Sequence, residues 1–350
     1  MGKNDSFVPA KMSELYSVIT AVLLFTSLQI SAQSFDIPSS RWGLSFGNSE
    51  KFNGLRINWR DKNVEQINGI NITLWIADSN RTATVNGLSL GLVMPEAAYL
   101  KGIQIGGLGV AAKKGITGIT VGLLGAGSGG KITGLTFGGL GVGSGGGING
   151  LAIGGLGVGS GGNLRGVALG GLGIGSGGQV TGVMLGGLGV GAGGDVTGLL
   201  FGGLGVGSGG DMTGIQVGGL AVGAGGEITG LSIGGLGVGS GEQMRGIAIG
   251  GIGVGAPRIS GLAIGGIGVG GKEIKGVALA AGFIRIADHG YFKGLSAGAF
   301  SYIKGRQNGL SIAIVNYAEE LNGVQLGLIN IAKNNPDFFR ILPVMNLHFD

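Results

Sequence analysis

Hydrophobic residues recur along this chain in a pattern with a period of 16 residues. Equivalent units open at ten glycines from Gly102 to Gly246, separated by nine consecutive intervals of 16 residues. On either side of this block the spacing varies between 14 and 18 residues, and about 18 units cover Asn53 to roughly Asn335. Self-similarity at one period predicts a solenoid in which each unit forms one coil.

The unit GLTFGGLGVGSGGGIN spans 134–149. Its apolar positions alternate as in a β-strand, but they change from odd-numbered to even-numbered residues in the middle of the unit. The first two strand positions are odd-numbered and the next three are even-numbered: Leu135 and Phe137, then Leu140, Val142 and Ser144. One straight strand would place the two groups on opposite faces. A bend at Gly138–Gly139 turns both groups into one interior, and Gly145–Gly147 supplies a second bend, because glycine accepts positive φ. We therefore predict coils of two or three short strands.

Stacking such coils in register places equivalent residues above one another at about 4.7–4.8 Å. The apolar columns expected inside are Leu135, Leu151, Val167, Val183, Leu199, Ile215, Leu231 and Ile247, and Leu140, Leu156, Leu172, Leu188, Leu204, Leu220, Leu236 and Ile252. The expected column of small residues is Ser128, Ser144, Ser160, Ser176, Ala192, Ser208, Ala224 and Ser240. The predicted fold is all-β: a glycine-rich parallel β-solenoid of about 18 coils, with atypical capping ends.

The two ends of the chain differ from the regular block, 102–275. Residues 33–101 hold irregular repeats and all three tryptophans, Trp42, Trp59 and Trp75, whereas residues 276–350 hold irregular repeats and most of the tyrosine. A solenoid needs such ends, because a bare last coil exposes unpaired backbone. We interpret both segments as caps; the alternative is that the aromatic side chains form a ligand platform.

Residues 1–32 have the features of a signal peptide. Lys3 and Lys11 precede the apolar run Val18–Leu28, and Ser31–Gln33 offers a cleavage site with small residues. A run of 11 residues is too short to span a bilayer. A buried N-terminal helix is the alternative, and a start at Met12 would remove both lysines. Export of a chain without cysteine favours a bacterial envelope protein.

Composition excludes several classes of protein. Glycine accounts for 86 of 350 residues, but no glycine at every third position indicates collagen. The hydrophobic fraction of 43% against 12% charged residues excludes a disordered chain. Glycine costs a helix about 1 kcal/mol relative to alanine, which excludes a bundle of transmembrane helices. The net charge of +5 comes without a basic cluster, so nucleic acid is not an expected partner.

The C-terminal repeats resemble a known family. NGLSIAIVNYA at 308–318 and NGVQLGLINIA at 322–332 resemble the NGLQLGLINIA-type repeats of a family of bacterial surface-repeat proteins, and 339–349 is similar to that family's closing stretch. Asn-Gly pairs at 53–54, 68–69 and 86–87 match it more loosely, whereas the central GGLGVGSGG block departs from it. The resemblance implies an exported envelope protein and supplies no catalytic residues.

Two polar columns are candidates for ligand binding. Asp195, Asp211 and Glu227 share one unit position, and three carboxylates about 5 Å apart would repel unless solvent or a cation such as Ca²⁺ screens them. Thr181, Thr197, Thr213 and Thr229 form a second column, which would suit an ice-binding face. A solvated corner and ordinary β propensity explain these two columns more simply, so we predict no metal site.

Catalysis and cofactor binding have little support in the sequence. Gly130-Lys131 is followed by Ile132 where a phosphate-binding loop needs Ser or Thr, and the GxGxxG matches lack the strand–loop–helix context of a dinucleotide site. Asp288-His289 is the only acid–histidine neighbour pair and is expected in a loop between coils; His348 is the other histidine. We predict no catalytic residue, cofactor or small-molecule substrate.

The sequence therefore predicts an exported, non-catalytic structural or adhesive protein of the cell surface or outer membrane, with an unknown surface partner. An outer-membrane β-barrel is the alternative, because about 15 residues suit a strand plus a turn and Phe349 near the terminus is typical of barrels. Barrel strands alternate in direction, however, whereas these neighbouring units repeat one pattern in one order. An ice-binding solenoid is a further alternative.

Overall fold

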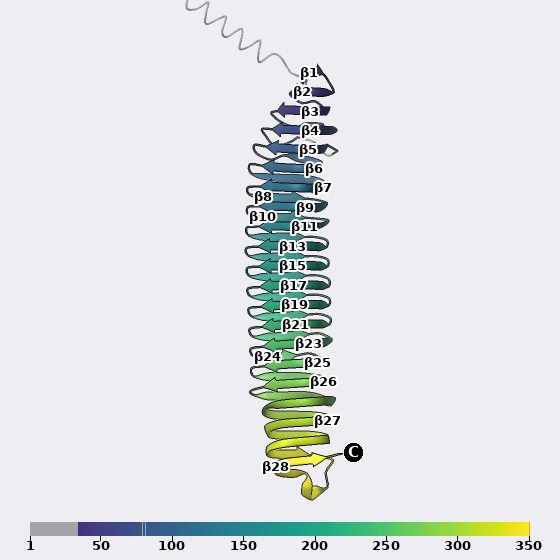
Figure 1. Cartoon of the computed structure of the whole chain (residues 1–350), viewed down its shortest axis with the longest axis vertical. Helices are drawn as coiled ribbons and strands as arrows, with labels where there is room; N and C mark the ends of the chain where they lie inside the picture. The colour runs from purple at the N-terminus through teal and green to yellow at the C-terminus, as the bar shows by residue number, and fades with distance from the viewer. Residues whose placement is uncertain (1–33, 79, 81, 350) are drawn as a thin grey trace, which may run out of the picture.

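The chain forms a rod of stacked coils (Figure 1). The computed structural model describes residues 34–349, except for 79 and 81. The predicted signal peptide therefore lies outside the described residues. The described part is a parallel β-solenoid of about 15 turns with roughly 16-residue spacing, which confirms the predicted fold class. The number of turns is slightly below the predicted 18.

Each regular coil contains one long strand and one short strand. After β9 (Lys131–Gly138) the chain bends, forms β10 (Gly141–Ser144), bends again and begins β11 (Gly147–Gly154). β9 pairs in parallel with β11 and β10 with β12, both in exact 16-residue register. The predicted bends at Gly138–Gly139 and after Ser144 are thus confirmed. Parallel neighbours along the described coils contradict the antiparallel barrel alternative.

Long strands stack into one sheet and short strands into another. The long strands are β3 (Lys51–Asn58), β4 (Gln66–Thr73), β5 (Thr84–Gly91), β6 (Glu96–Gly106), β7 (Gly109–Gly122), β9, β11, β13 (Leu164–Gly170), β15 (Val180–Gly186), β17 (Val196–Gly202), β19 (Met212–Gly218), β21 (Ile228–Gly234), β23 (Gln243–Gly250), β25 (Arg258–Gly265) and β26 (Gly268–Ala280). The short strands are β8 (Gly125–Ser128), β10, β12 (Gly157–Ser160), β14 (Gly173–Ser176), β16 (Gly189–Ala192), β18 (Gly205–Ser208), β20 (Ala221–Ala224), β22 (Gly237–Ser240) and β24 (Gly253–Gly255).

Antiparallel strands close both ends of the rod. β1 (Phe35–Ser39) pairs antiparallel with β2 (Trp42–Phe46), and β28 (Ile341–His348) pairs antiparallel with β27 (Phe283–Ala332), after the short 3₁₀ helix η1 (Asp337–Phe339). Both closing strands contain a proline, Pro38 and Pro343. A proline lacks the N–H that another strand would need, so these ends resist end-to-end pairing. Among the described residues, no helix has the length and apolar character needed to cross a membrane.

The interior differs from the predicted one. Val142 and Ser144 are buried as predicted, and Ile148 is buried as well, but Leu135, Phe137 and Leu140 are 49%, 42% and 50% exposed. The same holds along most of both predicted Leu columns, so their placement inside is wrong. The long strand instead turns its even-numbered residues inward, and Leu140 lies on the bend itself, outside both sheets.

The long strands turn inward a column of residues that could not be selected by hydrophobicity. Its members are Thr120, Thr136, Ala152, Ala168, Met184, Leu200, Gln216, Ser232 and Ala248, all buried. Their irregular pattern resembles that of an outward position. They lie inside because they alternate along the strand with the exposed residues Leu135 and Phe137. Polar members pair along the column: Thr120 with Gln104 and Ser232 with Gln216, each at 2.9 Å.

Glycine is required at the opening position of each unit. Gly134 and its equivalents have φ between +111° and +150°, within the long strand and not at the predicted corner. A Cβ at Gly134 would lie 2.1 Å from the carbonyl oxygen of Gly118 in the coil before it. At the bend the reason is space alone, because a Cβ at Gly139 would lie 1.7 Å from the carbonyl oxygen of Leu123. Positive φ and close stacking together explain why glycine recurs at these positions.

Candidate functional site

The largest surface feature of the rod is an apolar face. It consists of the outward residues of the long strands and of the bend that follows them. The bend column, here called the leucine ridge, comprises Leu108, Leu124, Leu140, Leu156, Leu172, Leu188, Leu204, Leu220, Leu236, Ile252 and Ile267. Its members are 45–54% exposed. Because side chains alternate between the two faces of a strand, burial of the inner column leaves the columns on either side of it pointing outward.

Two further columns extend this face along the long strands. Their exposed members include Ile119, Leu135, Val167, Leu199, Ile215 and Ile247 in one column, and Ile105, Phe137, Leu185 and Phe201 in the other. A groove of about 510 Å³ lies over Gly186 and Gly187, between Leu185 and Phe201. At about 4.8 Å per coil and 3.3 Å per residue, the three columns cover roughly 800–900 Å². The largest apolar patch on a typical monomer is about 300–600 Å².

The predicted acidic column serves the backbone of the next coil. Asp195 Oδ1 accepts the N–H of Asp211 at 3.1 Å, and Asp211 Oδ1 accepts the N–H of Glu227 at 2.7 Å. Glu227 then pairs with Arg245 at 3.0 Å. Asp195 and Asp211 are therefore turned toward the N–H of the next coil, and Glu227 is turned toward Arg245. Over residues 34–349, without 79 and 81, no group of three His, Asp or Glu side chains is arranged to hold a metal ion.

The threonine column lies on the outside but is short. Thr181, Thr197 and Thr213 are exposed and Thr229 is half-buried. Their strand register continues into Arg165 at one end and Arg245 at the other. Two residues further along each strand lie the apolar outward residues, so the threonines border the apolar face.

The acid–histidine pair is not assembled into a catalytic arrangement. Asp288 and His289 lie within β27 and not in a loop, because the extra residues of this repeat form a bulge opposite Gly271 and Glu273. Asp288 pairs with Lys304 at 2.9 Å. This hydrogen bond lowers the pKa of the Asp288 carboxyl below its usual value and raises the pKa of Lys304. His348 is distant in sequence and contacts Asn335 Oδ1 through Nδ1 at 2.6 Å.

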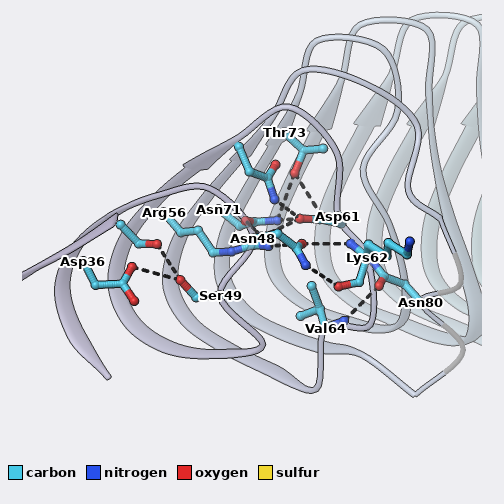
Figure 2. Close-up of polar contacts among 12 residues, drawn as sticks. Asp36, Asn48, Ser49, Arg56, Asp61, Lys62, Val64, Asn71, Thr73 and Asn80 are labelled. Carbon is cyan, nitrogen blue, oxygen red and sulfur yellow. Dashed lines mark hydrogen bonds and ion pairs between the residues drawn. The ribbon is translucent and has the colours of Figure 1, made fainter. Parts of the chain in front are cut away.

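A buried polar cluster, which sequence analysis did not find, lies at the N-terminal end (Figure 2). Arg56 of β3 points into the solenoid and is fully buried. It donates to Asp61, to Asn71 Oδ1 at 2.7 Å and to Asn48 Oδ1 at 2.8 Å. Asp61 Oδ2 also accepts from Asn71 and from Thr73, both at 3.0 Å. This buried ion pair therefore has hydrogen-bond partners on both sides, which its desolvation requires.

Next to this cluster is an open cleft of about 380 Å³. It is lined by Gly47, Asn48, Asn58, Trp59, Arg60, Lys62 and Asp78. Trp59 is 66% exposed and stacks on Trp75 with the rings 6.1 Å apart and 2° from parallel. The 16-residue spacing of the two tryptophans, one solenoid period, was the signal in the sequence for this stack.

Asn58 lines the cleft but its side chain is buried. Asn58 is 4% exposed, and its Nδ2 donates to Asp61. Its Oδ1 is buried and has no hydrogen-bond partner among the described residues. A buried carbonyl oxygen without a donor costs about 1–3 kcal/mol.

No protein-family model, curated protein or solved structure matches this chain. The two surface features that bear on function are the apolar face and the N-terminal cleft.

Proposed function

We propose that this protein is an exported, non-catalytic structural or adhesive repeat protein of the bacterial cell envelope or surface. The apolar face carries this proposal. A continuous strip of leucine, isoleucine and phenylalanine over most of the rod is an interaction surface, because exposed apolar patches of this size are typical of contact sites.

The size of the apolar face supports assembly. Removing apolar surface from water is favourable, and the resulting affinity depends on how well the two surfaces fit as well as on their area. The area also matches the roughly 800 Å² per partner of a standard protein interface. Either a second apolar protein surface or the edge of a membrane would meet this requirement, and both are available to an envelope protein.

The remaining features agree with a structural role. The predicted signal peptide would deliver the chain outside the cytoplasm, and the resemblance of the C-terminal repeats implies the same compartment. The proline-containing end strands restrict assembly through the ends, which leaves the sides of the rod for contacts. Ice binding lacks a specific observation in its favour, because the threonine column ends at arginines after four coils and borders leucines.

Localisation provides the first test. The full chain is expressed in a Gram-negative bacterium, and cytosolic, soluble periplasmic and envelope fractions are compared, with protease treatment of intact cells. We expect the processed chain in the envelope fraction and sensitive to external protease. A chain that stays in the cytosol with residues 1–32 attached would refute the proposal.

A ridge variant tests whether the apolar face makes the contact. Leu172, Leu188 and Leu204 are replaced together by serine, and Thr181, Thr197 and Thr213 are replaced by serine as the matched control. We expect the ridge variant to keep its β circular dichroism and to move from the envelope to the soluble fraction, whereas the control stays. Equal retention of both variants would show that the face makes no such contact.

A further inference from the structure

We propose that the cleft at the N-terminal end binds an oligosaccharide, with one sugar ring lying against Trp59. This inference deepens the adhesive part of the proposed function, on which it rests for a surface setting. The cleft, however, is separate from the apolar face that carries the structural part. The cleft offers a ligand an exposed flat ring on one side and a set of hydrogen-bonding side chains on the other.

The indole of Trp59 provides the apolar side. It is exposed to 66%, although a large aromatic side chain gains from burial. Trp75 stacks on it in the next coil with nearly parallel planes, which fixes the orientation of the ring. A ring held in place by its neighbour loses little freedom on binding, and such preorganisation raises affinity. One face of a sugar ring is made of C–H groups and fits a flat aromatic surface of this kind.

The other lining residues provide both donors and acceptors. Arg60 and Lys62 donate, and Asp78 accepts. The backbone of Lys62 is held by Asn48, which accepts its N–H at 2.9 Å and donates to its C=O. Hydroxyl groups of a sugar both donate and accept, so they can satisfy this mixed set.

The buried Arg56 cluster keeps this arrangement rigid. Arg56 binds Asn48 Oδ1 from inside the solenoid, so Asn48 is fixed at the cleft from behind (Figure 2). Asp61 of the same cluster accepts the Nδ2 hydrogen of Asn58, which leaves Oδ1 as the free end. Binding sites are selective when a second layer of hydrogen bonds fixes the residues that contact the ligand. The buried ion pair thus has a role beyond closing the end of the solenoid.

Other ligand classes fit this cleft less well. A purely apolar ligand would cover the charged groups of Arg60, Lys62 and Asp78 without hydrogen-bonding to them. A bare anion would meet the carboxylate of Asp78, which lies 4.0 Å from Arg60 and offsets its charge. The volume of about 380 Å³ lies within the 300–1,000 Å³ range of small-ligand sites, which suits one or two sugar units of a longer chain.

The test measures binding of defined glycans to the purified full-length protein. Cellohexaose, chitohexaose and hexagalacturonic acid are titrated in separate calorimetric experiments, with tryptophan fluorescence as a second readout. We expect at least one of the three to bind. Trp59→Ala should then weaken binding at least tenfold, Trp59→Phe should retain part of it, and Asp78→Ala should weaken it several-fold.

Trp42→Ala is the matched control, because Trp42 is also an exposed tryptophan of the N-terminal end, at 59%, but does not line the cleft. Circular dichroism of all variants checks that they fold. The proposal is overturned if none of the three glycans binds, or if Trp42→Ala and Trp59→Ala change binding equally. A folded chain that reaches the cell surface but binds no glycan would refute this inference alone, whereas a cytosolic chain would refute the proposed function.

Discussion

Replacing glycine by alanine at two positions of one coil compares a site that requires glycine with a site that does not. Gly182 in β15 has φ +127°, and a Cβ there would lie 1.9 Å from the carbonyl oxygen of Gly166. Gly191 in β16 lies on the outer side of the short-strand sheet, where an added Cβ meets nothing within 4 Å. The same substitution is therefore expected to have opposite effects at the two positions.

The expected magnitudes follow from these geometries. At Gly182 the positive φ costs about 1–2 kcal/mol for a residue with a Cβ. The overlap with a backbone oxygen adds about 1–3 kcal/mol, as overpacking does elsewhere. Gly182→Ala should therefore destabilise its coil by about 3 kcal/mol. Gly191→Ala should be neutral or stabilise by about 0.4–1 kcal/mol, because alanine restricts the unfolded chain more than glycine does.

Hydrogen exchange followed by mass spectrometry measures this coil by coil. Stability in a solenoid is a sum of repeat and neighbour terms, so the effect should be confined to coils near the substitution. We expect amides of β13, β15 and β17 to exchange about 100-fold faster in Gly182→Ala, since each 1.4 kcal/mol changes an equilibrium tenfold. Exchange in Gly191→Ala should equal that of the unchanged protein. Equal acceleration in both variants would refute the argument from φ and stacking distance.

Three further predictions concern the core, the repeats and the N-terminal end. Leu200→Asp should destabilise strongly, because it buries an unpaired charge, whereas Leu188→Asp on the exposed ridge should change the melting temperature little; equal melting curves would contradict the assignment of inside and outside. Deleting one unit, 182–197, should leave a shorter folded rod, whereas deleting 322–350 should cause aggregation by exposing a sheet edge; light scattering and circular dichroism of the two deletions decide this. Arg56→Ala should lower the free energy of unfolding of the N-terminal coils by about 3–5 kcal/mol, because it leaves a buried carboxylate without its cation; urea titration followed by tryptophan fluorescence would show no shift if the pair were dispensable.

The sequence alone determined the period, the parallel stacking and the bends. These follow from local chemistry: glycine recurs where the chain needs positive φ or close stacking, and identical units stack most simply in register. The buried column of Val142 and its equivalents and the small column at Ser144 could be predicted for the same reason. The serine hydroxyls of that column bond the carbonyls at the second bend, for example Ser144 to Gly130 at 2.7 Å.

Only the tertiary structure decided which side of the long strand faces inward. Alternation fixes that Leu135 and Thr136 point to opposite sides, but it does not say which of them is inside. Hydrophobicity favours leucine, and that choice is wrong here: Thr136 and its equivalents take the inward positions, and the apolar core is formed by Val142, Ile148 and their equivalents. The leucines therefore lie outside, where they form the surface that we propose is covered in the envelope.

The N-terminal cleft likewise depends on contacts that no local pattern contains. Arg56 looks like a surface residue in the sequence, since charged side chains are almost never fully buried without a partner. Its partner, Asp61, lies on the turn after β3, and Asn71 comes from the next coil, so the cluster exists only once the coils are stacked. The stacking of Trp59 on Trp75 follows from the period, but their position beside a polar cleft follows only from the way the first coils close the end of the rod.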